Sequence, residues 1–181
     1  MSVEHLAREV GIDARTVYHY FPSKRALFRS ATDAVFEEYA ASVADRVLAP
    51  GDVRQRLHGF VDAYRELYTT KPHVLPFIAV VMVEGMAVAR DERRGQPSDH
   101  GAFDPEDLGT IGQAALAFNH MVVDHAVAEG HLHASVTPDA AAALLQTVGM
   151  GLGLASLDPA TPFLTVLDAF DLLIDGALFR H

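Results

Sequence analysis

The sequence predicts an all-α protein. Apolar residues recur at helical spacing, no strand-like alternation of apolar and polar residues lasts long enough to count, and glycine or proline separates the periodic segments. With 181 residues, the chain can form one compact domain with a sizeable core, or one domain with a small appendage. It contains no cysteine, which excludes both disulfides and thiolate metal sites.

The N-terminal segment predicts two short helices joined by a glycine turn. Ser2 can cap a helix over residues 3–10, and Gly11 can supply the positive φ that ends it. Asp13 can cap a second helix that reaches Tyr20 or Phe21. The apolar positions, with the small Ala7 where the helices must come close, have the spacing of a helix-turn-helix: Val3, Leu6, Val10, Ile12 and Val17. An ordinary corner between two helices has similar spacing, so the pattern alone leaves both open.

The residue types on the second helix favour contact with DNA. With Val17 facing inward, the outward arc holds Arg15, Thr16, Tyr18 and His19. Arginine can fork onto guanine, histidine or threonine can reach base edges or phosphates, and tyrosine hydroxyls can donate to phosphate without sequence preference. Ser23 can then cap a long helix, to about residue 49, whose first amides and Lys24 can form an anion site.

The distribution of charge along the chain fits this interpretation. The formal net charge of −10, taken as an average, argues against nucleic acid. Residues 1–30, however, hold five basic and three acidic side chains, a net charge of +2, and the remaining residues carry −12. An acidic body is repelled by phosphate, whereas a small basic N-terminal segment can approach it.

The stretch VEHLAREVGIDARTVYHYFPSKRALF, residues 3–28, resembles the DNA-binding signature of the TetR family of bacterial transcriptional repressors. Its core, TVYHYFPSK, is far more specific than a generic helix-turn-helix. The resemblance implies a DNA-binding region over residues 1–45 and an all-α ligand-binding and dimerisation domain over residues 46–181. It also implies phosphate contacts by Thr16, Tyr18, Tyr20 and Lys24, and base contacts by Ala14, Arg15 and His19.

The function that the resemblance implies is that of a cytoplasmic, ligand-responsive transcriptional regulator, a repressor released from double-stranded operator DNA by a hydrophobic small molecule. Members of the family have a further helix before the helix-turn-helix, and this chain begins where that helix should already have ended. We expect that the true start lies upstream. The alternative is a truncated paralogue that does not bind DNA and acts as a helical small-molecule-binding or interaction protein.

The remaining sequence predicts a series of further helices. Helical spacing marks them over about residues 52–68, 72–89, 108–130, 138–157 and 161–178. Pro76 lies close enough to the start of its helix to be tolerated there or to kink it. Thr137 is a candidate N-cap with Pro138 at the first helical position. The polar residues 90–105 are expected to form a loop.

Residues 140–157 carry no charge, and their length approaches that of a membrane span. The stretch nevertheless includes Gln146 and three glycines, and Asp139 and Asp158 close it. A helix buried in protein is therefore expected, with no membrane span. The N-terminus lacks a basic segment followed by an apolar run, so it does not resemble a signal peptide.

The last two predicted helices are expected to form a homodimer. Gly149 and Gly153 lie one turn apart and would let two helices approach closely. With Gly151 they do not complete a nucleotide-binding glycine loop, because no strand precedes them. Apolar residues of the final helix are too numerous for one face, which predicts packing on two sides: Phe163, Leu164, Val166, Leu167, Phe170, Leu173, Ile174 and Leu178. The dimeric four-helix bundle of the TetR family, implied by the resemblance, has these features.

Aromatic and methionine residues of the middle helices predict a ligand site, although a plain core is the alternative for any one of them. The candidate ligand-binding residues are Phe60, Tyr64, Phe77, Met86, Phe118, His120 and Asp124. Their mostly apolar character predicts a hydrophobic small-molecule effector. His120 or Asp124, one helical turn apart, is expected to make the polar contact, and a plain surface pair is the alternative for these two residues.

No metal, cofactor or catalytic site is expected. His131 and His133 lie near His120 and Asp124 in the sequence, but a metal site needs three or four converging ligands, which this spacing does not supply. The chain has neither a nucleophile elbow nor an H-E-x-x-H motif, so nothing in it predicts an enzyme.

Overall fold

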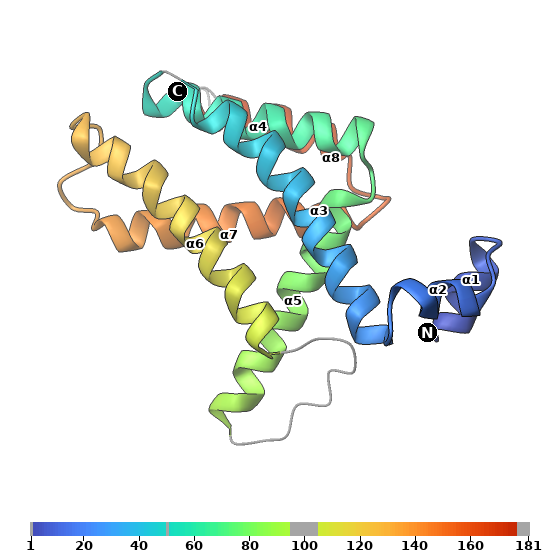
Figure 1. Cartoon of the computed structure of the whole chain (residues 1–181). Helices are drawn as coiled ribbons and strands as arrows, with labels where there is room; N and C mark the ends of the chain where they lie inside the picture. Colours follow the sequence, from blue (N-terminus) through green and yellow to red (C-terminus); the bar gives the residue numbers. More distant parts are fainter. Residues whose placement is uncertain (1, 50, 95–104, 177–181) are drawn as a thin grey trace.

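The computed structural model describes residues 2–49, 51–94 and 105–176 of the chain. These residues form eight α-helices and no strand, so the predicted all-α class is confirmed (Figure 1). In chain order the helices are α1 (Val3–Glu9), α2 (Ala14–Tyr20), α3 (Lys24–Val47), α4 (Val53–Thr70), α5 (Val74–Arg93), α6 (Pro105–Ala128), α7 (Pro138–Ala155) and α8 (Phe163–Ile174).

Side-chain caps fix where several helices begin. The residues whose side chains accept a hydrogen bond from a first-turn amide are Ser2, Asp13, Ser23, Asp52 and Thr137. At the start of α4 the Gln55 side chain also accepts from the Asp52 amide at 2.9 Å, which completes a capping box. These bonds satisfy amides that have no partner within their own helix, and they form at the starts that the sequence predicts.

Two helix ends differ from the prediction. α5 continues to Arg93, into residues expected to be a loop, because the first glycine after Ala89 is Gly95. α8 ends at Ile174, short of the predicted residue 178, and Gly176 follows with a φ of +69°. Glycine adopts this left-handed conformation at no steric cost, which favours the end of a helix there. Leu178 lies outside the described residues.

One apolar core joins α3 through α8. Leu67 of α4, Leu75 of α5 and Leu167 of α8 are its largest fully buried side chains. The other buried members come from all six helices: Val43, Val47, Val61, Ala63, Tyr64, Val74, Ile78, Val122, Leu152 and Phe163. Burial of an aliphatic side chain of this size stabilises the fold by roughly 1.5–3 kcal/mol, so this cluster fixes the arrangement of the body.

A second, small core holds the N-terminal helices. Val3 and Ala7 of α1 and Val17 of α2 are buried, and Ala7 is only 1% exposed, as a close approach of the two helices requires. Val10 and Ile12, also apolar positions of the predicted helix-turn-helix, are instead exposed. Val17 therefore faces inward as predicted, Ala14 packs against the same core, and the other residues of α2 are exposed.

Helix α3 connects the two cores. Leu27, near its start, packs against the small N-terminal core, and Val43 and Val47 belong to the body core. Figure 1 shows α1 and α2 at the N-terminal end of α3, to one side of the other helices. The predicted division at residue 45 falls inside α3 and remains a prediction.

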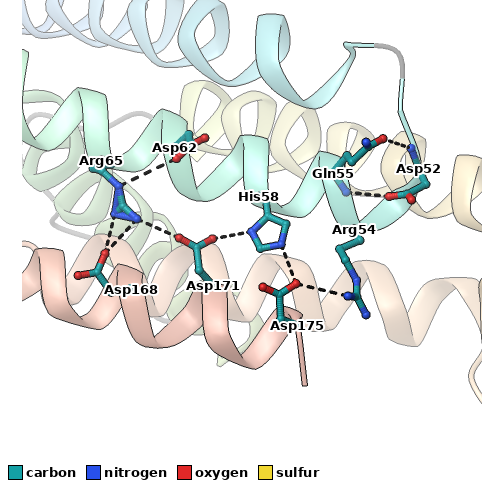
Figure 2. Close-up of polar contacts among 9 residues, drawn as sticks. All are labelled: Asp52, Arg54, Gln55, His58, Asp62, Arg65, Asp168, Asp171 and Asp175. Atoms are coloured by element: carbon teal, nitrogen blue, oxygen red, sulfur yellow. Dashed lines mark hydrogen bonds and ion pairs between the residues drawn. The ribbon is translucent and has the colours of Figure 1, made fainter. Parts of the chain in front are cut away.

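Charged side chains join α4 to α8 (Figure 2). The His58 ring of α4 contacts one carboxylate of α8 and one that directly follows the helix, with Nδ1 2.7 Å from an Asp171 oxygen and Nε2 3.1 Å from an Asp175 oxygen. Arg65 lies within 3.1 Å of Asp168 and 2.9 Å of Asp171. The sequence predicts a final helix that is apolar on two sides, and these charged contacts differ from that prediction.

The two sides of α8 have different partners. Phe163 and Leu167 are buried in the body core, whereas Leu164, Leu172 and Leu173 are 40%, 48% and 50% exposed. Within the chain, apolar packing therefore covers one side of the helix only. Across the described residues, no helix combines the length and apolarity needed to cross a membrane.

Candidate DNA-binding helix and ligand cavity

Helix α2 presents the residues that the sequence predicts for DNA contact. The Asp13 carboxylate accepts from the Arg15 amide at 2.7 Å and fixes the start of the helix. With Val17 buried, the exposed residues of the helix are Arg15, Thr16, Tyr18, His19 and Tyr20. Ala14 is half-buried against the small N-terminal core, so only part of its side chain is open to solvent.

The Tyr18 hydroxyl has a partner within the chain. It donates to a carboxylate oxygen of Glu4 in α1 at 3.0 Å. This hydrogen bond is the main cause that raises the pKa of Tyr18, since losing the proton would place two negative groups together. The family resemblance places the Tyr18 hydroxyl on phosphate, whereas here the acidic Glu4 side chain lies beside it.

Two further aromatic rings lie at the C-terminal end of α2. The His19 and Tyr20 rings meet edge to face, with centroids 5.2 Å apart. Tyr20 is 71% exposed, which leaves its hydroxyl free to reach a partner outside the chain.

The start of α3 adds a positive charge beside the first amides of the helix. Ser23 caps the helix by accepting from the Ala26 amide at 3.1 Å, and Lys24 is exposed at the first helical position. Phe21, between α2 and α3, packs on the small N-terminal core and fixes the angle between the two helices. Arg15, Tyr20 and Lys24 are thus all exposed in one compact unit of two helices and a helix start.

The body contains a cavity of about 250 Å³ between α3, α4, α5, α6 and α7. α3 contributes Phe36, Tyr39, Ala40, Val43 and Ala44 to its wall. The other helices contribute Phe60, Tyr64, Ile78, Met82, Phe118, Asn119, Leu145, Gln146, Gly149 and Met150. Most of these groups are apolar or aromatic, as in small-molecule sites generally.

Two polar pairs interrupt this apolar wall. The Tyr39 and Tyr64 hydroxyls lie 3.1 Å apart, and Tyr64 donates to the Gly149 carbonyl at 3.3 Å. Burial raises the pKa of both tyrosines, so both are protonated hydroxyls at neutral pH. The second pair spans α6 and α7, where the Asn119 amide donates to the Gln146 side-chain oxygen at 2.6 Å.

The structure places some of the predicted ligand-binding residues at this cavity and others elsewhere. Phe60, Tyr64 and Phe118 line it. Phe77 does not, because its ring stacks on Phe28 of α3 with centroids 5.9 Å apart, next to the buried Val81. The side chain of Met86 lies outside the described part of the structure.

The two residues predicted to make the polar contact to a ligand also lie away from the cavity lining. His120 and Asp124 are absent from the lining, and the two side chains form no hydrogen bond or ion pair with each other. Asn119, the neighbour of His120, points to the cavity instead because it lies one helical position earlier on α6. The plain surface alternative therefore describes the exposed Asp124 better.

Two signals in the sequence could have located the cavity wall more completely. Phe36, Tyr39 and Val43 repeat at the spacing of one helix face and mark the side of α3 that faces the cavity. Asn119 and Gln146 are uncharged polar residues inside otherwise apolar stretches. Such residues need a partner when they are buried, and here each is the partner of the other.

The glycines of α7 differ in what they face. A β-carbon on Gly153 would lie 3.4 Å from the Ala79 side chain of α5, so α5 and α7 approach closely at this position. One on Gly149 would contact Tyr64 and Phe60 at the cavity. Gly151 is exposed with open space around it. Gly149 and Gly153 thus have neighbours within the chain, and their role in pairing two chains stays a prediction.

No group of three His, Asp or Glu side chains that could hold a metal ion occurs in the part of the chain that the structure describes. The buried cores and the cavity described above account for the remaining clusters of aromatic and methionine residues. The exposed arc of α2 and the apolar cavity are the two candidate functional sites.

Helices α1 and α2, with the turn between them and the exposed arc of α2, have the arrangement of a helix-turn-helix. Residues 1–31 match the family model described as bacterial regulatory proteins, tetR family. This segment, from α1 to the first turns of α3, is therefore similar to the DNA-binding region of that family of regulators. No curated protein and no solved structure matches the chain.

Proposed function

We propose that the protein is a repressor that leaves its operator DNA when a small apolar molecule occupies the cavity between α3 and α7. The observation that carries the proposal is the position of α3. We call α1, α2 and the start of α3 the DNA-binding unit. Near its start, α3 packs against α1 and α2 through Leu27. Its second half forms one wall of the cavity through Phe36, Tyr39 and Val43.

In this proposal α2 is the helix that enters the major groove. Arg15 and His19 read base edges, together with the exposed part of Ala14, and Thr16, Tyr18, Tyr20 and Lys24 hold phosphates on either side. The Tyr18 hydroxyl exchanges its bond to Glu4 for a phosphate oxygen when DNA binds. The exposure of the long side chains in this set supports these roles.

A ligand can weaken DNA binding only if it prefers the protein conformation in which the DNA-binding units no longer fit the groove. A molecule in the cavity contacts five residues of α3, so a shift of that helix is the direct route from the cavity to α2. Phe28 and Phe77 stack between α3 and α5 and form the contact that such a shift would strain.

The protein acts as a homodimer through the outward faces of α7 and α8. On α7 the exposed positions form a mostly apolar stripe: Ala140, Ala143, Leu144, Thr147, Gly151 and Leu154. The exposed large apolar residues of α8 are Leu164, Leu172 and Leu173. Two such faces would form a four-helix bundle that holds two α2 helices about 34 Å apart, one turn of duplex DNA.

The test is fluorescence anisotropy with labelled DNA from the region next to the gene, first without and then with compounds that raise the melting temperature. Specific binding that such compounds reverse supports the repressor. A protein that binds small molecules but no DNA sequence would instead support the helical small-molecule-binding alternative. Compounds that bind the cavity without changing DNA affinity would contradict the ligand response.

A further inference from the structure

Among the described residues, no charged side chain lines the cavity. Of its fifteen lining residues only Tyr39 and Tyr64 can ionise, and both are protonated at neutral pH. A carboxylate or ammonium group placed here would lose its water shell without gaining a counter-ion, which costs several kcal/mol. The ligand that fits this wall is therefore uncharged.

Aromatic rings form much of the wall, which favours a flat ligand. They are Phe36, Tyr39, Phe60, Tyr64 and Phe118. Phe60 and Tyr64 lie with ring centroids 4.5 Å apart, and Tyr39 meets Tyr64 edge to face at 6.0 Å. A planar aromatic ligand can continue such tilted and edge-to-face contacts, and the thioethers of Met82 and Met150 can adapt to its outline.

The tyrosine pair has a defined direction of hydrogen bonding. The Gly149 carbonyl can only accept, so the single Tyr64 proton is used in the bond to it. The Tyr39 hydroxyl then donates its proton to the Tyr64 oxygen 3.1 Å away. Both hydroxyl protons are therefore donated within the protein, and the Tyr39 oxygen keeps lone pairs that can accept a hydrogen bond. A ligand that meets Tyr39 must therefore supply the donor.

The volume of the cavity limits the size of the ligand. An apolar cavity of about 150 Å³ holds one benzene ring. On that scale a cavity of about 250 Å³ holds about ten non-hydrogen atoms, which corresponds to two fused aromatic rings.

We propose that the cavity binds an uncharged two-ring aromatic compound that carries one hydrogen-bond donor, which it gives to the Tyr39 oxygen. This inference rests on the proposed function in one respect only, that the cavity is a ligand site. Asn119 and Gln146 form the second polar point of the wall and can contact a further polar substituent.

A matched series of compounds tests the proposal by isothermal titration calorimetry on the full chain. Naphthol has the rings and the donor, methoxynaphthalene has the rings and an acceptor only, naphthoate adds a charge, and decanol has the donor without the rings. We expect naphthol to bind tightest, methoxynaphthalene to bind about tenfold more weakly for loss of one hydrogen bond, and naphthoate and decanol to bind more weakly than both.

The Tyr39→Phe variant assigns the donor contact. It keeps the ring and removes the acceptor oxygen, so naphthol and methoxynaphthalene should bind it with equal affinity. Tyr68→Phe is the matched control, because Tyr68 packs on Phe163 and does not line the cavity. This control should keep the preference for naphthol.

Several results would overturn the proposal. They are the absence of binding by any member of the series, an equal affinity of the unchanged protein for naphthol and methoxynaphthalene, a preference for naphthoate, and a Tyr39→Phe variant that still prefers naphthol.

DNA affinity measured with bound naphthol tests the proposed repressor function separately from the ligand class. Binding with the expected selectivity but no change in DNA affinity supports the ligand class and contradicts the ligand-responsive repressor.

Discussion

The Nδ1 atom of His58 lies 2.7 Å from a carboxylate oxygen of Asp171, while Nε2 of the same ring lies 3.1 Å from Asp175 (Figure 2). A neutral imidazole has one N–H and can donate to one carboxylate only, whereas the imidazolium ion donates to both. The geometry thus fits the protonated ring. The hydrogen bond to Asp171 is the main cause that raises the pKa of His58 above its ordinary value of 6.5, and Asp175 adds to it.

We predict that the protein loses stability as the pH rises above neutrality. Because the folded state binds the His58 proton more tightly than the unfolded chain does, this contribution is complete below the unfolded pKa near 6.5. It is lost as the pH rises through the folded pKa. The ring is partly exposed, so the loss should be at most about 1 kcal/mol. Melting temperatures measured across this pH range at low salt would detect it.

Arg65 and Arg54 also face these carboxylates and stay charged, so they keep part of the contact between α4 and α8 when His58 is neutral. The His58→Gln variant should remove the pH-dependent part of the stability and leave the part that the arginine ion pairs contribute. His5, an exposed histidine near Glu9, gives a control in which substitution leaves the pH profile unchanged. A profile that does not differ between the unchanged protein and His58→Gln would contradict the assignment.

Local signals explain why much of the fold could be predicted from the sequence. Ser2, Asp13, Ser23 and Thr137 cap helices where the sequence places them, because a cap depends on residues within one turn. Val17 is buried while its neighbours on α2 are exposed, as the spacing requires. These features depend on residues close together in the chain, so a single sequence contains them.

Long-range partners could not be predicted in the same way. Phe77 is aromatic and apolar like Phe60, yet it stacks on Phe28 while Phe60 lines the cavity. The choice depends on how α3 and α5 cross, which no local pattern specifies. The same holds for His58, whose carboxylate partners lie more than 110 residues further along the chain, and for Gly153, whose neighbour is Ala79 of another helix.

The Gly149→Leu variant should fill the cavity without unfolding the protein. A β-carbon there would lie 3.5 Å from the Tyr64 hydroxyl and 3.6 Å from the Phe60 ring, which are ordinary contacts, and the rest of the leucine side chain would extend along the wall. Replacing glycine inside a helix also favours the helix by up to about 1 kcal/mol. We therefore expect an unchanged or raised melting temperature and at least about tenfold weaker binding of naphthol.

Gly151→Leu is the matched control for that variant, because Gly151 lies two positions further along α7 and has open space around it. It should leave naphthol binding unchanged. Loss of naphthol binding in both variants would mean that α7 has changed its packing as a whole, and the effect of Gly149→Leu could not then be assigned to the cavity.

Gly151→Leu should also weaken the homodimer. The residue lies on the exposed stripe of α7 between Leu144 and Leu154, where a leucine would push a second copy of the helix away. Gly151→Ala adds only a methyl group and should weaken it less. Sedimentation velocity at micromolar concentration would report the change. A monomer before any substitution, or a dimer that Gly151→Leu leaves intact, would contradict the proposed interface.

Glu4 is expected to reduce DNA affinity. Its carboxylate accepts from the Tyr18 hydroxyl, a group that is proposed to hold phosphate, and it places a negative charge beside the same site. The Glu4→Gln variant removes the charge while keeping an acceptor for the hydroxyl, so DNA should bind more tightly at every sequence tested. Glu9, at the other end of α1, is the control position. Unchanged affinity in Glu4→Gln would place Tyr18 away from the DNA.

Arg15 and Lys24 should differ in what their loss does to DNA binding. Lys24 at the start of α3 is proposed to contact phosphate, so Lys24→Ala should weaken all sequences alike and reduce the slope of log affinity against log salt by about one unit. Arg15, on the exposed arc of α2, is proposed to read a base. Arg15→Ala should therefore cost ~1–3 kcal/mol on the preferred sequence and remove the preference at one base pair.

The measurement is a set of anisotropy titrations on the operator and on operators changed one base pair at a time, each at several salt concentrations. Arg25 follows Lys24 on α3 and gives a third variant with the same loss of charge. If Arg15→Ala weakens every sequence by the same factor, Arg15 contacts the backbone and α2 does not read bases through it. If Lys24→Ala changes sequence preference, the start of α3 lies nearer to the bases than a phosphate contact permits.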